Sequence, residues 1–165
     1  MTTGRSVAKF VKFQIESSSG AMADIPVNSF GSVGLTYGET DVTALQEALT
    51  SILNAQGSFS TTISGPFDNT AFQAASGTGA RPALSGSHTV LNALNGGATA
   101  KSFGIYFGIQ ADWATNDPVF GAIDSILVSQ YTVDPSSMTY SAKISTAGNR
   151  TNDPAWGTTE IAASS

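Results

Sequence analysis

Two neighbouring stretches, Ala122–Val133 and Ser137–Thr146, decide the fold class of this chain. Between Met138 and Ser145, apolar and polar side chains alternate, and only a pleated strand places such a period of two on opposite faces. From Ile126 to Val133 the sequence is rich in β-branched and aromatic residues and alternates less strictly, which is typical of a strand flanked on both sides. Asp134-Pro135-Ser136 supplies turn residues. We therefore predict a β-hairpin.

Apolar patterning elsewhere predicts further strands around this hairpin, over residues 7–15, 29–37, 58–64 and 101–110. The length of 165 residues fits one domain, 1–165. We expect a mainly β fold, an antiparallel β-sandwich or barrel with one or two short flanking helices. Extended polar arms are expected at about 1–6 and 149–165, and these are too polar to fold alone, so they could become ordered on a neighbour.

A helix is predicted over residues 41–54. Its apolar side chains, from Val42 to Leu53, recur at spacings of three and four, and Thr40 or Asp41 can cap its start. Glu39, Asp41 and Glu47 would then be the negative start of this helix, where the helix dipole favours them.

A second, shorter helix is predicted over about 86–94, with Ser85 or Ser87 as its cap. The lone histidine, His88, lies beside these serines, which raises the question of a Ser-His hydrolase. No Gly-x-Ser-x-Gly elbow accompanies it. We interpret His88 as a capping or solvated side chain.

The composition argues against a catalytic or metal site and favours a subunit of a larger assembly. Charged residues make up 12% of the chain, against about 25% in ordinary globular proteins. So little charge indicates a subunit whose surface is largely covered by neighbours. The net charge of −5 argues against nucleic-acid binding, which needs a basic surface. Without cysteine, and with few titratable groups, we expect no enzyme, no cofactor and no metal site.

Acidic and amide residues between 112 and 124 raise the question of calcium, but they lack the spacing of a calcium-binding loop. At the N-terminus, Lys9 and Lys12 interrupt the apolar run 7–13, so it is neither a signal-peptide core nor a membrane span. We expect a soluble protein made in the cytoplasm.

One motif occurs twice: Thr115–Gly121 reads Thr-Asn-Asp-Pro-Val-Phe-Gly, and Thr151–Gly157 reads Thr-Asn-Asp-Pro-Ala-Trp-Gly. Local turn geometry explains both copies, because Asn-Asp-Pro builds a turn and the aromatic can pin it to the body. The alternative is that the two copies are matched contacts to neighbouring subunits.

The order of these segments resembles the tail tube proteins of long-tailed bacteriophages over roughly residues 30–157. The resemblance lies in a strand ending Leu35-Thr36-Tyr37-Gly38-Glu39-Thr40 and an alternating strand closing in Gly65-Pro66-Phe67-Asp68. It continues through the short helix near Ser87–Leu91, the strand at Phe103–Tyr106 and the last hairpin. The long helical insertion at 41–54 departs from the family.

This resemblance implies a structural virion subunit, assembled in the host cytoplasm. Six-membered rings of the subunit would stack into a hollow conduit, through which DNA passes without specific binding, and other virion proteins would be partners. Two alternatives stay open. One is a capsid decoration or cement protein, and the other is a carbohydrate-binding module in which Trp113 and Trp156 stack on sugars.

The residues expected at subunit interfaces are cations of the arms and large aromatic side chains. Arg5 and Arg150 can form bidentate pairs with a neighbour's carboxylates. Trp113, Phe120 and Trp156 are candidate buried anchors. For the two tryptophans, packing within the chain is the alternative.

Overall fold

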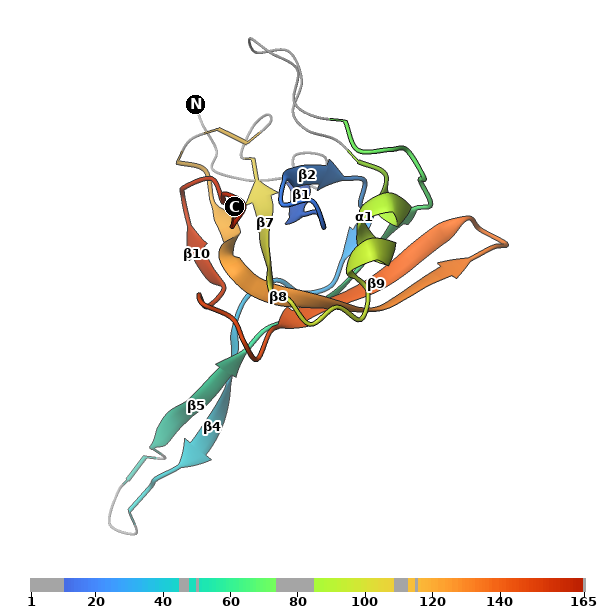
Figure 1. The fold of residues 1–165 in the computed structure, drawn as a ribbon. Helices are drawn as coiled ribbons and strands as arrows, with labels where there is room; N and C mark the ends of the chain where they lie inside the picture. Colours follow the sequence, from blue (N-terminus) through green and yellow to red (C-terminus); the bar gives the residue numbers. More distant parts are fainter. Residues whose placement is uncertain are drawn as a thin grey trace, which may run out of the picture.

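A computed structural model of the chain describes residues 11–44, 48, 49, 51–73, 85–108, 113, 114 and 116–164. These residues form a mainly β, antiparallel fold with one short helix (Figure 1). The elements are β1 (Val11–Glu16), β2 (Met22–Ile25), β3 (Ser29–Phe30), β4 (Thr36–Asp41), β5 (Ile52–Ser58), β6 (Ser60–Pro66), α1 (Ser87–Leu94), β7 (Lys101–Phe107), β8 (Val119–Asp134), β9 (Thr139–Thr146) and β10 (Ala155–Gly157).

The predicted central hairpin is confirmed: β8 and β9 pair antiparallel, with Val128 opposite Ile144. Tyr140, Ala142 and Ile144 are at most 1% exposed, so the apolar set of the alternating strand faces the core. β8 is also flanked on both sides, because it pairs with β7 as well as with β9. A register shift between Ser129 and Thr132 bends this long strand.

The main sheet curls back on itself (Figure 1). Its strand order is β2-β1-β7-β8-β9-β6-β3, so β2 and β3 are the two ends of the path. These ends are joined by three residues of chain, and Asn28 N donates to Ser64 O at 2.8 Å next to β3. The segment from Met22 to Phe30 therefore passes from pairing with β1 to pairing with β6. Of sandwich and barrel, the single curled sheet is closer to a barrel.

Aromatic side chains fill the inside of this sheet. The Phe59 ring stacks on Phe103 at 5.5 Å between centroids and lies 4.9 Å from Phe120. The helix α1 covers the core with Val90, Leu91 and Leu94, which are all buried. Its predicted range is confirmed, but its predicted cap is wrong. Gly86 is the N-cap, and as a glycine it has no side chain with which to cap the helix. Ser87 is the first helical residue, and its hydroxyl donates to Pro66 O.

The helix predicted over 41–54 is wrong. Asp41 ends β4 and Ile52 begins β5, and these strands pair antiparallel as a separate two-stranded sheet. Thr43 joins them, because its hydroxyl accepts from Ser51 N at 2.7 Å. A helix here would need a partner for its apolar face, whereas the described residues of the segment lie away from the body. Glu39 and Asp41 are accordingly strand residues, and Glu47 lies outside the described residues.

Candidate assembly interface

The β4–β5 hairpin projects away from the rest of the molecule (Figure 1). All six residues of β4 are exposed. Five large apolar side chains of the projection are in contact with solvent over about half of their surface or more: Tyr37 48%, Val42 45%, Leu49 83%, Ile52 49% and Leu53 61%. Large apolar side chains exposed together on one element make it a candidate interaction surface.

Both long edges of this hairpin carry backbone groups that no third strand pairs, within the part of the chain that the structure describes. Neither edge has the lysine or proline with which natural sheets block association. An isolated two-stranded hairpin is at best marginally stable in water. The hairpin is thus suited to being completed by another molecule.

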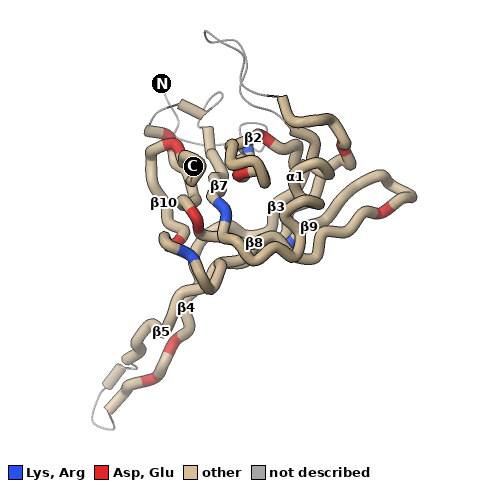
Figure 2. The backbone as a smooth tube through the Cα atoms, viewed as in Figure 1, with Lys and Arg blue, Asp and Glu red and all other residues tan. Residues whose placement is uncertain are grey.

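The charge of the projection has one sign. Residues 36–58 contain three acidic side chains and no lysine or arginine. In Figure 2 the described part of the hairpin accordingly carries acidic bands alone. Its surface is therefore apolar and acidic, and a partner with matching chemistry would offer apolar side chains and cations.

A groove of about 440 Å³ lies at the root of the hairpin. Leu35 and Tyr37 line one side, and Arg150, Asp153 and Pro154 line the other. The Tyr37 ring also lies over Gly57, where a Cβ atom would approach it to 2.6 Å. The glycine therefore lets the tyrosine fold across β5 at the junction with the body.

Of the two predicted arginines, Arg5 lies outside the described residues. Arg150 is already engaged within the chain. Its Nε donates to Asp153 Oδ1 at 2.6 Å, and Nη1 donates to Ala147 O at 3.0 Å. This side chain is still 36% exposed, so a neighbour could reach the guanidinium only in competition with Asp153.

The predicted aromatic anchors fall into three different environments. The prediction that Phe120 is an interface anchor is wrong, because this side chain is completely buried in the chain's own core and offers no surface to a neighbour. Trp113 packs edge-on against Tyr106 at 5.1 Å, and its Nε1 donates to Asp117 O at 2.9 Å. Trp156 is 54% exposed, although one side of its ring packs on Phe107 and Phe120.

The repeated motif pairs with itself. β10 lies antiparallel to the start of β8, with Trp156 opposite Phe120 and Gly157 opposite Val119. The aromatic residues at equivalent positions of the two copies thus face each other across strands. Their contact lies within one chain, and it attaches the C-terminal arm to the sheet edge.

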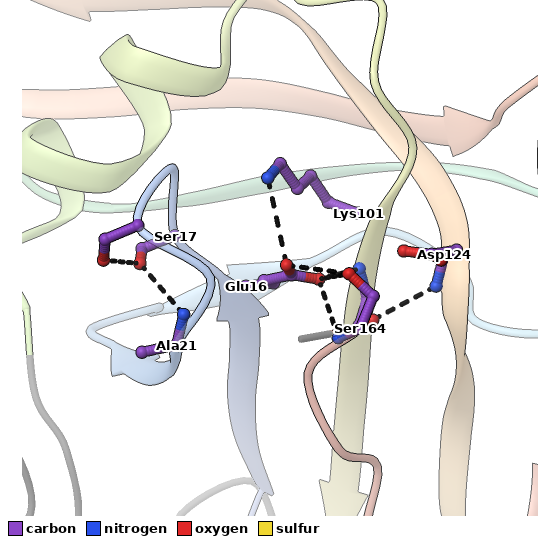
Figure 3. A network of polar contacts seen from close by, with 8 residues as sticks. Glu16, Ser17, Ala21, Lys101, Asp124 and Ser164 are labelled. Atoms are coloured by element: carbon purple, nitrogen blue, oxygen red, sulfur yellow. Dashed lines mark hydrogen bonds and ion pairs between the residues drawn. The ribbon is translucent and has the colours of Figure 1, made fainter.

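The C-terminal arm continues along the body after β10. Ile161 N donates to Tyr106 Oη at 3.0 Å. Ser164 donates to the Glu16 carboxylate through both its backbone N, at 3.3 Å, and its hydroxyl (Figure 3). The expectation that this arm is too polar to fold alone is therefore wrong for residues up to 164, because the arm makes these bonds on its own chain.

Glu16 is 2% exposed, and its charge is held by several donors. Ser102 N donates to Oε2 at 3.2 Å, and Lys101 Nζ lies 3.9 Å from Oε1. Burial raises the pKa of Glu16, but the hydrogen bonds from Ser102 and Ser164 outweigh it and the pKa is lowered overall. The carboxylate is therefore charged at neutral pH and fastens the arm to β1.

The structure also bears on the hydrolase, metal-site and membrane-span questions that the sequence raised. His88 is partly buried, and its Nδ1 lies 3.0 Å from Tyr131 Oη, while the Ser87 hydroxyl bonds backbone groups. Among the described residues, no three His, Asp or Glu side chains converge as a metal site would require. Nor does that part of the chain contain a helix long and apolar enough to cross a membrane.

Sequence reasoning missed the projecting hairpin, because its apolar residues were assigned to a buried helix face. A signal was present in the β-branched residues Thr40, Val42, Thr43 and Ile52, which favour strands. No family model matches the chain, and no curated protein matches it.

Proposed function

We propose that this protein is a structural subunit of the phage tail tube type, which self-assembles through the β4–β5 hairpin into rings and stacks around a hollow conduit. The observation that carries the proposal is the projecting, unpaired hairpin, with Leu49 and Leu53 83% and 61% exposed. Such surface is costly to leave in water, at about 25 cal/mol per Å². Association between copies would cover it.

The geometry of the projection favours a head-to-tail contact. The exposed apolar residues lie on a narrow extension, and the surface that it contacts on another copy must differ from the extension itself if rings are to form. Heterologous contacts of this kind close into rings or continue as open stacks. The strand edges add main-chain hydrogen bonds to such a contact.

The outer face of the curled sheet suits a conduit wall. Across β6, β9 and β8 the residues in register on this face are mostly hydroxyl-bearing: Thr62, Lys143 and Ser129 in one row, Ser64, Ser141 and Thr132 in the next. A neutral hydroxyl face offers little fixed charge to phosphate, and Lys143 is the cation within these two rows. We assign this face to the lumen, past which DNA would move without specific binding.

The experiment compares oligomeric state between the wild-type chain and the variant Leu49→Ser/Leu53→Ser. Mass photometry over a concentration series, followed by negative-stain microscopy, should show rings or tubes of uniform bore for the wild type. Both leucines are exposed, so the variant should keep its fold and remain monomeric. Met138→Ser is the matched control, because Met138 is 51% exposed but lies in the β8–β9 turn.

A wild-type chain that stays monomeric at high concentration would overturn the proposal. Monomers or trimers that bind expanded capsids would instead identify a decoration protein. Glycan binding that Trp156→Ala abolishes would identify a carbohydrate-binding module. Assembly that both the double variant and Met138→Ser retain would keep the function but remove the hairpin from it.

A further inference from the structure

An acidic pocket of about 470 Å³ lies beside the start of α1, on the body and away from the projecting hairpin. Its walls come from β2 and the chain just after it, the loop after β6, and Ser85. The carboxylates of Asp24 and Asp68 line it, together with the apolar side chains of Ile25 and Pro26. No lysine or arginine is among its described lining residues.

Backbone hydrogen bonds fix the shape of this pocket. His88 N donates to Asp68 O at 2.9 Å, and Gly86 N donates to Thr70 O at 3.0 Å. Ser85 N donates to Asp24 O at 3.2 Å, which ties the third wall to the first. The pocket is thus built by bonds between segments far apart in sequence.

Each carboxylate uses one oxygen for the fold. Asp68 Oδ1 accepts from Thr70 N at 2.9 Å and from its hydroxyl at 2.6 Å, while Asp24 Oδ1 accepts from Gln14 Nε2 at 2.5 Å. The bonds from Thr70 lower the pKa of Asp68, so it is ionised at neutral pH.

A second observation points to a ligand in this pocket. Ser85, which lines it, is 5% exposed, and its hydroxyl has no hydrogen-bond partner. A buried hydroxyl without a partner costs free energy. A ligand that carries several N–H donors would pair with this oxygen and with the carboxylates. A guanidinium group, with five donors and a permanent charge, matches the set.

The chain itself carries such a group in the right charge context. Residues 1–12 contain three basic side chains, Arg5, Lys9 and Lys12, and no acidic one. β1 begins at Val11, on the far side of Phe13, which is opposite Ile25 in the register. The six peptide units from Arg5 to Val11 can span at most about 20 Å.

We infer that the acidic pocket formed by Asp24, Asp68 and Ser85 receives the Arg5 guanidinium of a second copy of this chain. The inference rests on the proposed self-association, which it deepens by naming a second contact between copies. The contact is heterologous, because the arm and the pocket are different surfaces. It is compatible with the same rings and stacks.

Crosslinking between copies tests the inference, since the chain has no cysteine of its own. Two single variants are mixed and oxidised: Ser6→Cys, next to Arg5, and Asn69→Cys, next to Asp68. Both leave Arg5 and the two carboxylates intact. We expect a 6–69 disulfide, identified by peptide mass spectrometry, and no 6–136 disulfide when Ser136→Cys replaces Asn69→Cys as the control. A 6–69 link can form in this mixture only between copies.

Absence of the 6–69 link in the mixture overturns the inference, as does a link that forms only inside the double variant Ser6→Cys/Asn69→Cys. The oligomeric state of the wild-type chain is measured alongside. Assembly without the link leaves the proposed function standing and removes the arm contact. Neither assembly nor link overturns both, and a link without higher assembly retains the arm contact alone.

The role of charge is tested by adding Asp68→Asn to the Asn69→Cys chain. The amide keeps an oxygen that can accept the Thr70 bonds, but it removes the charge. We expect the link yield to fall about fivefold, the upper range for a solvent-accessible ion pair. Asp134→Asn is the matched control, because Asp134 Oδ1 likewise accepts from the residue two positions on, Ser136 N, at 2.9 Å. Equal yields in the two variants would overturn the assignment of Asp68.

Discussion

Glu16 shows how one residue can tie distant parts of this chain together. It ends β1, it accepts a hydrogen bond from Ser102 on β7, and it holds Ser164 near the C-terminus. Breaking the bonds of a buried carboxylate leaves its donors and its charge uncompensated. The sequence alone gave no sign of this role, because nothing local to Glu16 says that residue 164 lies beside it.

The first prediction concerns Glu16 and pH. Its pKa is lower in the folded chain than in the unfolded one, so its contribution to stability is present above the unfolded pKa. It is lost as the pH falls through the folded value. We expect Glu16→Gln to lower the free energy of unfolding by about 2 kcal/mol at pH 7. The difference from wild type should shrink below pH 4, as measured by urea unfolding at several pH values.

Asp134→Asn serves as the control for this prediction, because Asp134 is an exposed turn residue outside the Glu16 network. It should leave stability at pH 7 close to wild type. If Glu16→Gln and wild type differed by the same amount at pH 3 and pH 7, the hydrogen-bonded charge would not be the source of the effect.

The second prediction uses the glycines of the repeated motif, Gly121 and Gly157. A Cβ on Gly121 would collide with the Phe103 carbonyl, where β8 lies between β7 and β10, whereas a Cβ on Gly157 would meet open space. We expect Gly121→Ala to cost about 3 kcal/mol of stability and Gly157→Ala to change it by less than about 0.5 kcal/mol. Thermal and urea unfolding measure both. Equal costs would contradict the packing argument.

At the scale of elements, alternation predicted strands correctly where one face of the strand is buried. The single strand predicted over 29–37 is wrong, because only Ser29–Phe30 forms a strand there and the exposed strand β4 begins at Thr36. Phe59, Thr61 and Ile63 are all 5% exposed or less, which confirms the pattern at 58–64. The helix over 41–54 was wrong for the opposite reason. Periodicity indicates a buried face only where a partner within the chain covers it, and the described part of the hairpin has no such partner.

The candidate interface was predictable only in part from the sequence. Trp156 is 54% exposed, and its place at an interface stays a prediction. Its environment depends on Phe107 and Phe120, which are remote in sequence. Phe120 looked equivalent in its motif and is instead a core residue, because β10 covers its strand edge. Two equal motifs thus have unequal exposure, since each lies at a different depth in the sheet.

The third prediction concerns the C-terminal arm as an element. Ending the chain at Gly148 removes β10, the Trp156 packing and the bonds to Tyr106 and Glu16. We expect a loss of about 3 kcal/mol in the free energy of unfolding, from apolar burial and hydrogen bonds together. The shortened chain should also bind more of a hydrophobic dye, because the edge of β8 is uncovered. Unchanged stability would mean that the arm contributes nothing on its own chain.

For the whole molecule, the body and the hairpin have different physical requirements. The body is a curled sheet with a filled aromatic core, and its sheet ends are joined through the segment between β2 and β3. The hairpin is exposed on both faces and both edges. A molecule built in this way folds around one part and associates through the other, so folding and assembly should respond to different substitutions.

The last prediction follows from this separation. Association stabilises the folded chain by mass action, by about 2.7 kcal/mol when the concentration is 100 times the dissociation constant. For a domain of this size, that corresponds to a rise of about 5–10 °C in the melting temperature. We expect this rise across a concentration series of the wild type, measured by calorimetry. Leu49→Ser/Leu53→Ser should melt at one temperature throughout, close to that of dilute wild type, because both leucines are exposed in the monomer. A double variant that melted well below dilute wild type would show that the hairpin stabilises the monomer itself.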